Sequence, residues 1–128
     1  MGPGNADELL RAARSCLERL TPSAAARAAA EGALIIDIRP VDQRSRDGEI
    51  PGAAVVARNV LEWRLDPECP HRQPELARTD RRVILICDEG YQSSLAAATL
   101  RTFGLDATDV IGGAQEWIRC GLPLEEAR

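Results

Sequence analysis

The chain has 128 residues, a usual length for one compact domain, of which 45% are hydrophobic and 28% charged. Its formal net charge of −4 excludes a general attraction to nucleic acid or to an anionic membrane surface. The apolar runs are much shorter than the roughly 20 residues of a membrane span, and residues 1–7 contain no export signal. We therefore expect a cytoplasmic protein whose partners include neither nucleic acid nor membrane.

The cysteines and the single histidine give no metal-binding pattern. Cys16, Cys69, Cys87 and Cys120 are scattered, without a Cys-x-x-Cys pair, and His71 stands alone. This spacing predicts no metal site and no cofactor. In a reducing cytoplasm we expect free thiols, with Cys16 and Cys120 packed as small apolar residues on helices and Cys69 exposed in a loop.

Helix and strand signals alternate along the chain. Apolar residues at helical spacing predict a helix over 5–20, a second helix runs from Thr21 to Glu31, and a continuous apolar run predicts a buried strand over 33–38. The expected elements that follow are a short helix within 41–48, a strand over 54–57, a helix over 59–65, a loop over 66–74, a short helix to 78, a strand over 82–87, a helix over 93–103, a strand over 108–111 and a helix over 114–120. Such alternation predicts an α/β fold with a largely parallel sheet.

The segment around Cys87 is the most informative one for function. A buried strand brings Cys87 to its carboxyl end, and a short loop with Gly90 leads from there into a helix. In open α/β sheets ligands bind at this edge, and a loop entering a helix directs several backbone N–H groups at one point. These dipoles stabilise a thiolate, so Cys87 is predicted to be a nucleophile. The alternative is a structural cysteine at the end of a strand.

Four stretches, in order, resemble the motifs of rhodanese-like domains. The loop Cys87-Asp-Glu-Gly-Tyr-Gln-Ser93 resembles the active-site loop of that family, and Leu34-Ile-Ile-Asp-Ile-Arg39 resembles its first-strand motif. The turn Gly48-Glu-Ile-Pro-Gly-Ala53 and the closing Gly112-Gly-Ala-Gln-Glu-Trp117 complete the set. Because the resemblance begins near Thr21, we expect an N-terminal helical extension over 1–20 and a rhodanese-like domain over 21–125.

This resemblance implies a fold, a reaction and a site. The fold is a three-layer α/β sandwich in which helices flank a central, mostly parallel, five-stranded sheet. The reaction is sulfur transfer: Cys87 takes sulfane sulfur from thiosulfate, a thiol persulfide or a protein persulfide, and passes it to a thiol, cyanide or protein acceptor. The oligomeric state is left open. The expected roles are a cradle of backbone amides from Asp88, Glu89, Gly90, Tyr91, Gln92 and Ser93, loop support from Asp37 and Arg39, and a substrate contact or a surface charge at Arg58.

Departures from the family pattern and other functions also bear on the prediction. Glu49 stands where the family often has histidine, and Asp88 and Glu89 stand where thiosulfate-using members carry basic or neutral residues. These carboxylates either repel a dianionic donor or point into water.

A phosphatase of this fold needs a longer loop closed by arginine, which Gln92 and Ser93 do not provide. A non-catalytic binding or redox-sensing module that uses Cys87 is the remaining alternative.

Overall fold

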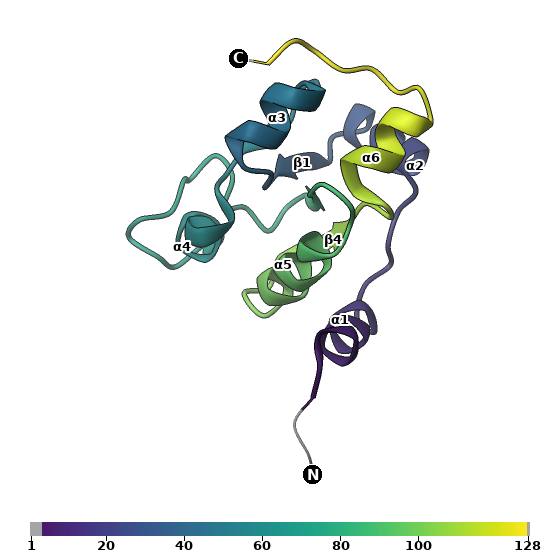
Figure 1. Ribbon diagram of the computed structural model, residues 1–128. Helices are drawn as coiled ribbons and strands as arrows, with labels where there is room; N and C mark the ends of the chain where they lie inside the picture. Colours follow the sequence, from purple (N-terminus) through teal and green to yellow (C-terminus); the bar gives the residue numbers. More distant parts are fainter. Residues whose placement is uncertain (1–3, 128) are drawn as a thin grey trace.

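A parallel sheet forms the middle layer of the computed structural model, which describes residues 4–127 (Figure 1). The sheet order is β2-β1-β3-β4, and every pairing between these four strands is parallel. Their bounds are β1 Leu34–Asp37, β2 Ala54–Val55, β3 Arg82–Ile86 and β4 Asp106–Asp109. The register places Asp37 opposite Ile86, so β1 and β3 end together beside Cys87.

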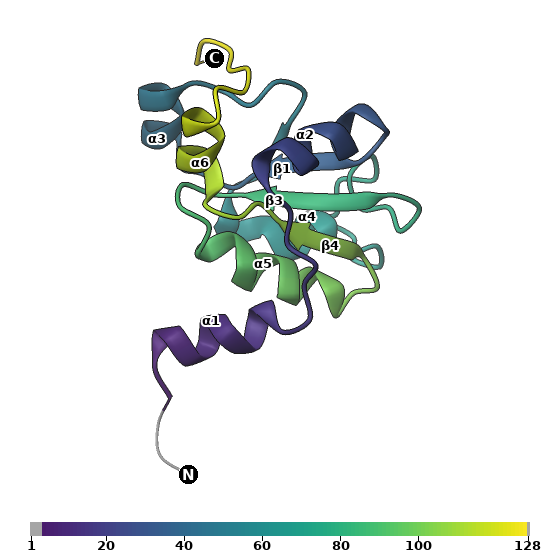
Figure 2. The ribbon, with the colours of Figure 1, turned by 90° about the vertical axis from the view of Figure 1, so that its right-hand side faces the viewer.

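Two hydrophobic cores form on the two faces of this sheet. Strand residues alternate between them, so that Ile84 belongs to one core and its neighbour Leu85 to the other, and both are fully buried. On the first face lie α4 (Leu61–Leu65), which follows the 3-10 turn η1 (Arg58–Val60), and α5 (Gln92–Arg101). The second face is covered by α2 (Pro22–Ala30) and α6 (Gly113–Arg119) (Figure 2).

Two further helices lie at the periphery of this three-layer α/β sandwich. Helix α3 (Val41–Asp47) follows β1, and α1 (Ala6–Arg14) packs along the outer side of α5 (Figure 2). No helix among residues 4–127 combines the length and the apolarity needed to cross a membrane.

The predicted fold class is confirmed, but the predicted fifth strand is wrong. Within residues 4–127 the sheet has four strands, and beyond β4 only Leu20 adds to it, through an isolated parallel bridge to Val110. The Leu20 amide donates to Asp109 O at 3.0 Å, and Leu20 O accepts from the Ile111 amide at 2.8 Å. The ladder cannot continue because Pro22, which has no N–H, begins α2 directly after this bridge.

Some helix predictions also need correction. The helix expected over 5–20 ends at Arg14, because the chain turns there and extends to the sheet edge at Leu20. The helix expected before residue 78 is only a turn, in a segment whose prolines interrupt helical hydrogen bonding. Cys16 and Cys120 are exposed rather than packed, since Cys16 lies past the end of α1 and Cys120 caps α6.

Candidate active site

Cys87 lies directly after β3, at the carboxyl edge of the sheet, with 7% of its surface exposed. Its Sγ atom accepts hydrogen bonds from the amides of Gly90 at 3.2 Å and Ser93 at 3.3 Å. The thiol also contacts Ser93 Oγ at 3.2 Å, as a donor. Because α5 begins at Gln92, the sulfur is held at the N-terminal end of that helix, where the positive end of the helix dipole favours an anion.

The rest of the loop supplies further donors. Within residues 4–127, the amides of Asp88, Glu89, Tyr91 and Gln92 donate to no protein acceptor. Loop amides without an internal acceptor are available to bind an anion next to the sulfur. Gly90 makes the necessary curl with a φ of +90°, a conformation that favours glycine.

A buried carboxylate organises the start of α5. Asp109, the last residue of β4, accepts hydrogen bonds at Oδ2 from Ser93 Oγ at 2.8 Å and Ser94 Oγ at 2.7 Å. Both serines and Asp109 are fully buried. Arg19 neutralises the carboxylate through an ion pair of 2.8 Å. Ser93 is thus fixed at its hydroxyl while its amide faces the cysteine sulfur.

Cys87 lines a cavity with a volume of about 320 Å³. Its lining comes from the end of β1, from α3 and η1, and from the loop after Cys87: Ile38, Arg39, Pro40, Gln43, Arg58, Cys87, Asp88, Glu89, Tyr91 and Gln92. Arg58 lies on this wall, where it donates to Gln92 Oε1 at 3.2 Å and pairs with Glu62 at 2.8 Å. Its guanidinium is therefore shared with protein acceptors.

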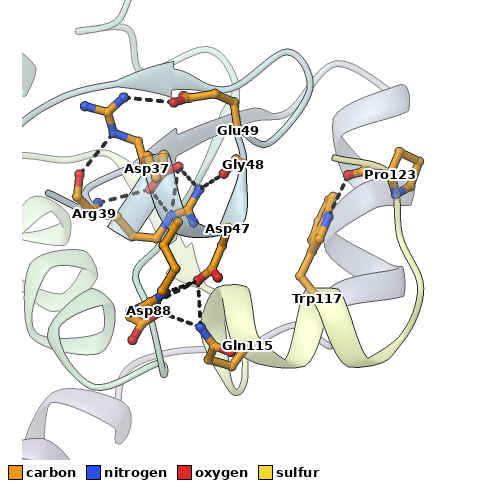
Figure 3. A network of polar contacts seen from close by, with 11 residues as sticks. Asp37, Arg39, Asp47, Gly48, Glu49, Asp88, Gln115, Trp117 and Pro123 are labelled. Atoms are coloured by element: carbon orange, nitrogen blue, oxygen red, sulfur yellow. Dashed lines mark hydrogen bonds and ion pairs between the residues drawn. The ribbon is translucent and has the colours of Figure 1, made fainter. Parts of the chain in front are cut away.

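The two loop carboxylates lie in different environments. Asp88 pairs with Arg46 at 3.0 Å and accepts from Gln115 Nε2 at 2.8 Å (Figure 3). The same guanidinium binds Asp47 and lowers the pKa of that carboxyl through the hydrogen bond. Glu89 is exposed and has no ion-pair partner among residues 4–127. Of the two predicted charges at the pocket mouth, Asp88 is compensated and Glu89 is not.

A buried ion pair supports the opposite wall. Arg39 binds Asp37 at 2.7 Å and donates to Gly48 O at 2.9 Å, which connects the end of β1 to the end of α3 (Figure 3). Glu49, at the position where the family often has histidine, is buried and pairs with Arg44 at 3.0 Å. Among residues 4–127, no three His, Cys, Asp or Glu side chains are grouped as metal ligands would be.

Comparison with known proteins places this site in a family. The profile of the rhodanese-like domain matches residues 21–120. The chain belongs to the rhodanese-like domain family. A search of the curated proteins returned no match.

Solved structures with the same fold include three that differ in their described roles. One is a Rhodopseudomonas palustris CGA009 protein of unknown function, described as a possible tyrosine phosphatase. The two are 32% identical, the match covers 98% of this chain and 97% of that one, and the TM-score is 0.89. A thiosulfate sulfurtransferase from Pseudomonas aeruginosa is 26% identical over 87% of this chain and 20% of that one, with a TM-score of 0.70. A rhodanese-related protein from Thermoplasma volcanium is 22% identical over 83% of this chain and 95% of that one, with a TM-score of 0.67.

The rhodanese-like site contains residues that sequence reasoning named and others that it missed. Cys87 and the six residues after it form one continuous segment, made of the loop and the first two residues of α5. Arg39 and Arg58 lie at the cavity wall, and Asp37 holds Arg39. Arg14, Arg19, Arg46 and Asp109 were missed. Each contacts the loop or α5 from a distant part of the sequence, and an isolated arginine or aspartate gives no local signal of such a partner.

Proposed function

We propose that this rhodanese-like protein is a sulfurtransferase whose Cys87 carries sulfur as a persulfide. The Cys87 thiolate attacks the outer sulfur of a donor, and the S–S bond of the donor breaks with its electron pair leaving on sulfite or a thiolate. An acceptor thiolate or cyanide then attacks the outer sulfur of the persulfide and releases the Cys87 thiolate. Neither step needs a cofactor.

The observation that carries this proposal is the set of amides around the sulfur. Two N–H groups, from Gly90 and Ser93, already point at Sγ, and the neighbouring loop amides are unengaged among residues 4–127. The outer sulfur of a persulfide is an anion one bond beyond Sγ, and it fits such an environment without a charged side chain. The cavity gives a donor or an acceptor access to this point.

Phosphatase activity is the second candidate, because the similar Rhodopseudomonas palustris protein is described as a possible tyrosine phosphatase. Phosphate binding in such a loop calls for a cation in bidentate contact. Here the residue six positions after Cys87 is the buried Ser93, whose hydroxyl binds Asp109, and Arg58 is already bound to Glu62. These contacts favour sulfur over phosphate. We expect no hydrolysis of p-nitrophenyl phosphate above that of the Cys87→Ser variant.

Mass spectrometry tests the proposal directly. The other thiols, Cys16, Cys69 and Cys120, are free and would also take up sulfur, so they are first replaced by serine to leave Cys87 alone. After incubation with thiosulfate or glutathione persulfide, we expect this protein to become about 32 Da heavier and to lose that mass with cyanide.

The matched control adds Cys87→Ser to the same background and should show no mass change. Absence of the adduct on Cys87 with every donor would overturn the proposal. Formation of a sulfenic acid or a mixed disulfide instead, after mild oxidation, would favour a redox-sensing module.

A further inference from the structure

Two arginines from the segment before residue 21 reach the loop that follows Cys87. Arg14, at the end of α1, donates through Nη2 to Gly90 O at 2.8 Å and through Nε to Ser94 Oγ at 3.0 Å. Arg19 donates through Nη2 to the same carbonyl at 3.1 Å. The segment that contains both arginines lies outside residues 21–120, the part that matches the family profile. The match to the Rhodopseudomonas palustris structure extends over this segment, since it covers 98% of the chain.

These contacts act on a peptide that borders the sulfur. Gly90 O and the Tyr91 N–H belong to one peptide unit, and no peptide bond among residues 4–127 is cis. In a trans peptide the C=O and the N–H point in opposite directions. With the carbonyl held toward the two guanidinium groups, the Tyr91 N–H points away from them, and it is one of the amides that have no protein acceptor. Positive charge on the carbonyl side also polarises the peptide and strengthens its N–H as a donor.

The same segment also constrains the Ser93 amide, which donates to the Cys87 sulfur. Arg19 pairs with Asp109 through Nε at 2.8 Å, and Asp109 accepts from the hydroxyls of Ser93 and Ser94. Because the Ser93 amide donates to Sγ, the contact between Asp109 and the Ser93 hydroxyl constrains the residue that supplies this donor. Removing Arg19 would leave a fully buried carboxylate without its counter-ion.

We propose that the N-terminal segment completes the anion cradle, with Arg14 and Arg19 as positioning residues for the backbone amides around the Cys87 sulfur. The catalytic meaning of this cradle rests on the proposed sulfur transfer. The packing of the segment supports a role in the site, since α1 has no fully buried residue and its link to the loop is made by polar contacts. Arg14 and Arg19 thus supply contacts to the loop carbonyl of Gly90 that come from outside residues 21–120.

The test uses the full chain with Cys87 as its only cysteine. The main variant is Arg14→Ala, because it leaves the pair between Arg19 and Asp109 intact. The matched control is Arg11→Ala, which removes an exposed arginine of the same helix whose side chain has no hydrogen bond among residues 4–127. Two rates are measured at one pH: alkylation of Cys87 by iodoacetamide, and persulfide formation from glutathione persulfide.

We expect Arg14→Ala to slow both reactions about fivefold, the size of one net hydrogen bond, and Arg11→Ala to leave both unchanged. Arg14→Lys should give intermediate rates, because one ammonium cannot bind Gly90 O and Ser94 Oγ with the geometry of a guanidinium. Thermal unfolding of each variant is recorded. A purely structural role would lower the midpoint and leave the alkylation rate, measured well below it, at the control value.

Equal or faster alkylation in Arg14→Ala than in Arg11→Ala would overturn the inference. Alkylation does not depend on sulfur transfer, so the two proposals fail in different ways. If no variant forms a persulfide while the alkylation rates still differ, the sulfurtransferase proposal is wrong and the positioning role of the arginine stands.

Discussion

At the residue scale, both the backbone conformation and the close neighbours of residue 90 favour glycine. Its φ is +90°, and a Cβ built there would lie 2.9 Å from the amide nitrogen of Gly112 and 3.3 Å from Nη2 of Arg19. We predict that Gly90→Ala displaces the loop, since its amide is one of the donors to the Cys87 sulfur, and lowers the rate of persulfide formation by about tenfold or more. The rate is measured by mass spectrometry in the background with Cys87 as the only cysteine.

Gly104 is a matched control that separates the effect of backbone strain from the effect of atoms close to the glycine. Gly104, just past α5, has a similar φ of +85°, but a Cβ there would meet no atom within 4 Å. Both alanine variants incur the strain of a left-handed conformation, about 1 to 2 kcal/mol in urea unfolding. Only Gly90→Ala should lose persulfide formation. Equal losses in both variants would show that general destabilisation, and not the loop, sets the rate.

At the scale of elements, the pair of Asp37 and Arg39 joins the end of β1 to the end of α3. The Arg39 side chain is fully buried and also binds Gly48 O. We predict that Arg39→Ala lowers the free energy of unfolding by about 3 to 5 kcal/mol, because it leaves a buried carboxylate without a counter-ion. The control is Arg78→Ala, which breaks an exposed pair with Asp80 and should leave the free energy of unfolding nearly unchanged, because solvent screens that pair. Similar losses in urea unfolding would contradict this account.

Elements differed in how far the sequence alone predicted them. The buried strands β1 and β3 were predictable because each is a run of apolar residues covered on both faces. The end of α1 was not, because apolar residues continue at helical spacing to Leu20, and the pairing of Leu20 with Val110 takes the chain out of the helix. The same bridge replaces the fifth strand. Helical periodicity is local, whereas sheet-edge pairing depends on the whole fold.

In the candidate site, too, the residues close together in sequence were predictable and the distant partners were not. The loop from Cys87 to Ser93 is contiguous, so its residues and the direction of its amides toward the sulfur could be inferred from a strand, a glycine and a helix start. The contacts of Arg14 with Gly90 and of Arg19 with Asp109 join residues 76 and 90 positions apart. Nothing in the local sequence indicates such partners. The packing of α1 against α5 brings Arg14 to Gly90, and the bridge between Leu20 and Val110 brings Arg19 to Asp109.

At the scale of the whole molecule, charge bears on the choice of donor. The chain has a formal net charge of −4, and Glu89 adds an uncompensated carboxylate at the cavity, while Asp88 is paired with Arg46. Thiosulfate is a dianion, so Glu89 should slow its approach. We predict that Glu89→Gln raises the rate of persulfide formation from thiosulfate about twofold to fivefold at low ionic strength. The gain should shrink as salt is added, since the charge is exposed.

A second variant distinguishes local repulsion of thiosulfate by Glu89 from an effect of the net charge of the protein. Glu31 is also exposed, but it caps α2 just before β1, at the amino ends of the strands and therefore at the edge of the sheet opposite Cys87. Glu31→Gln and Glu89→Gln change the net charge of −4 by the same one unit, so a net-charge effect would raise the thiosulfate rate equally in both. If Glu89 instead acts because it lies at the cavity, Glu31→Gln should leave the rate of persulfide formation from thiosulfate unchanged. If neither substitution alters the rate, the Glu89 side chain points into water and the donor is selected by contacts inside the cavity.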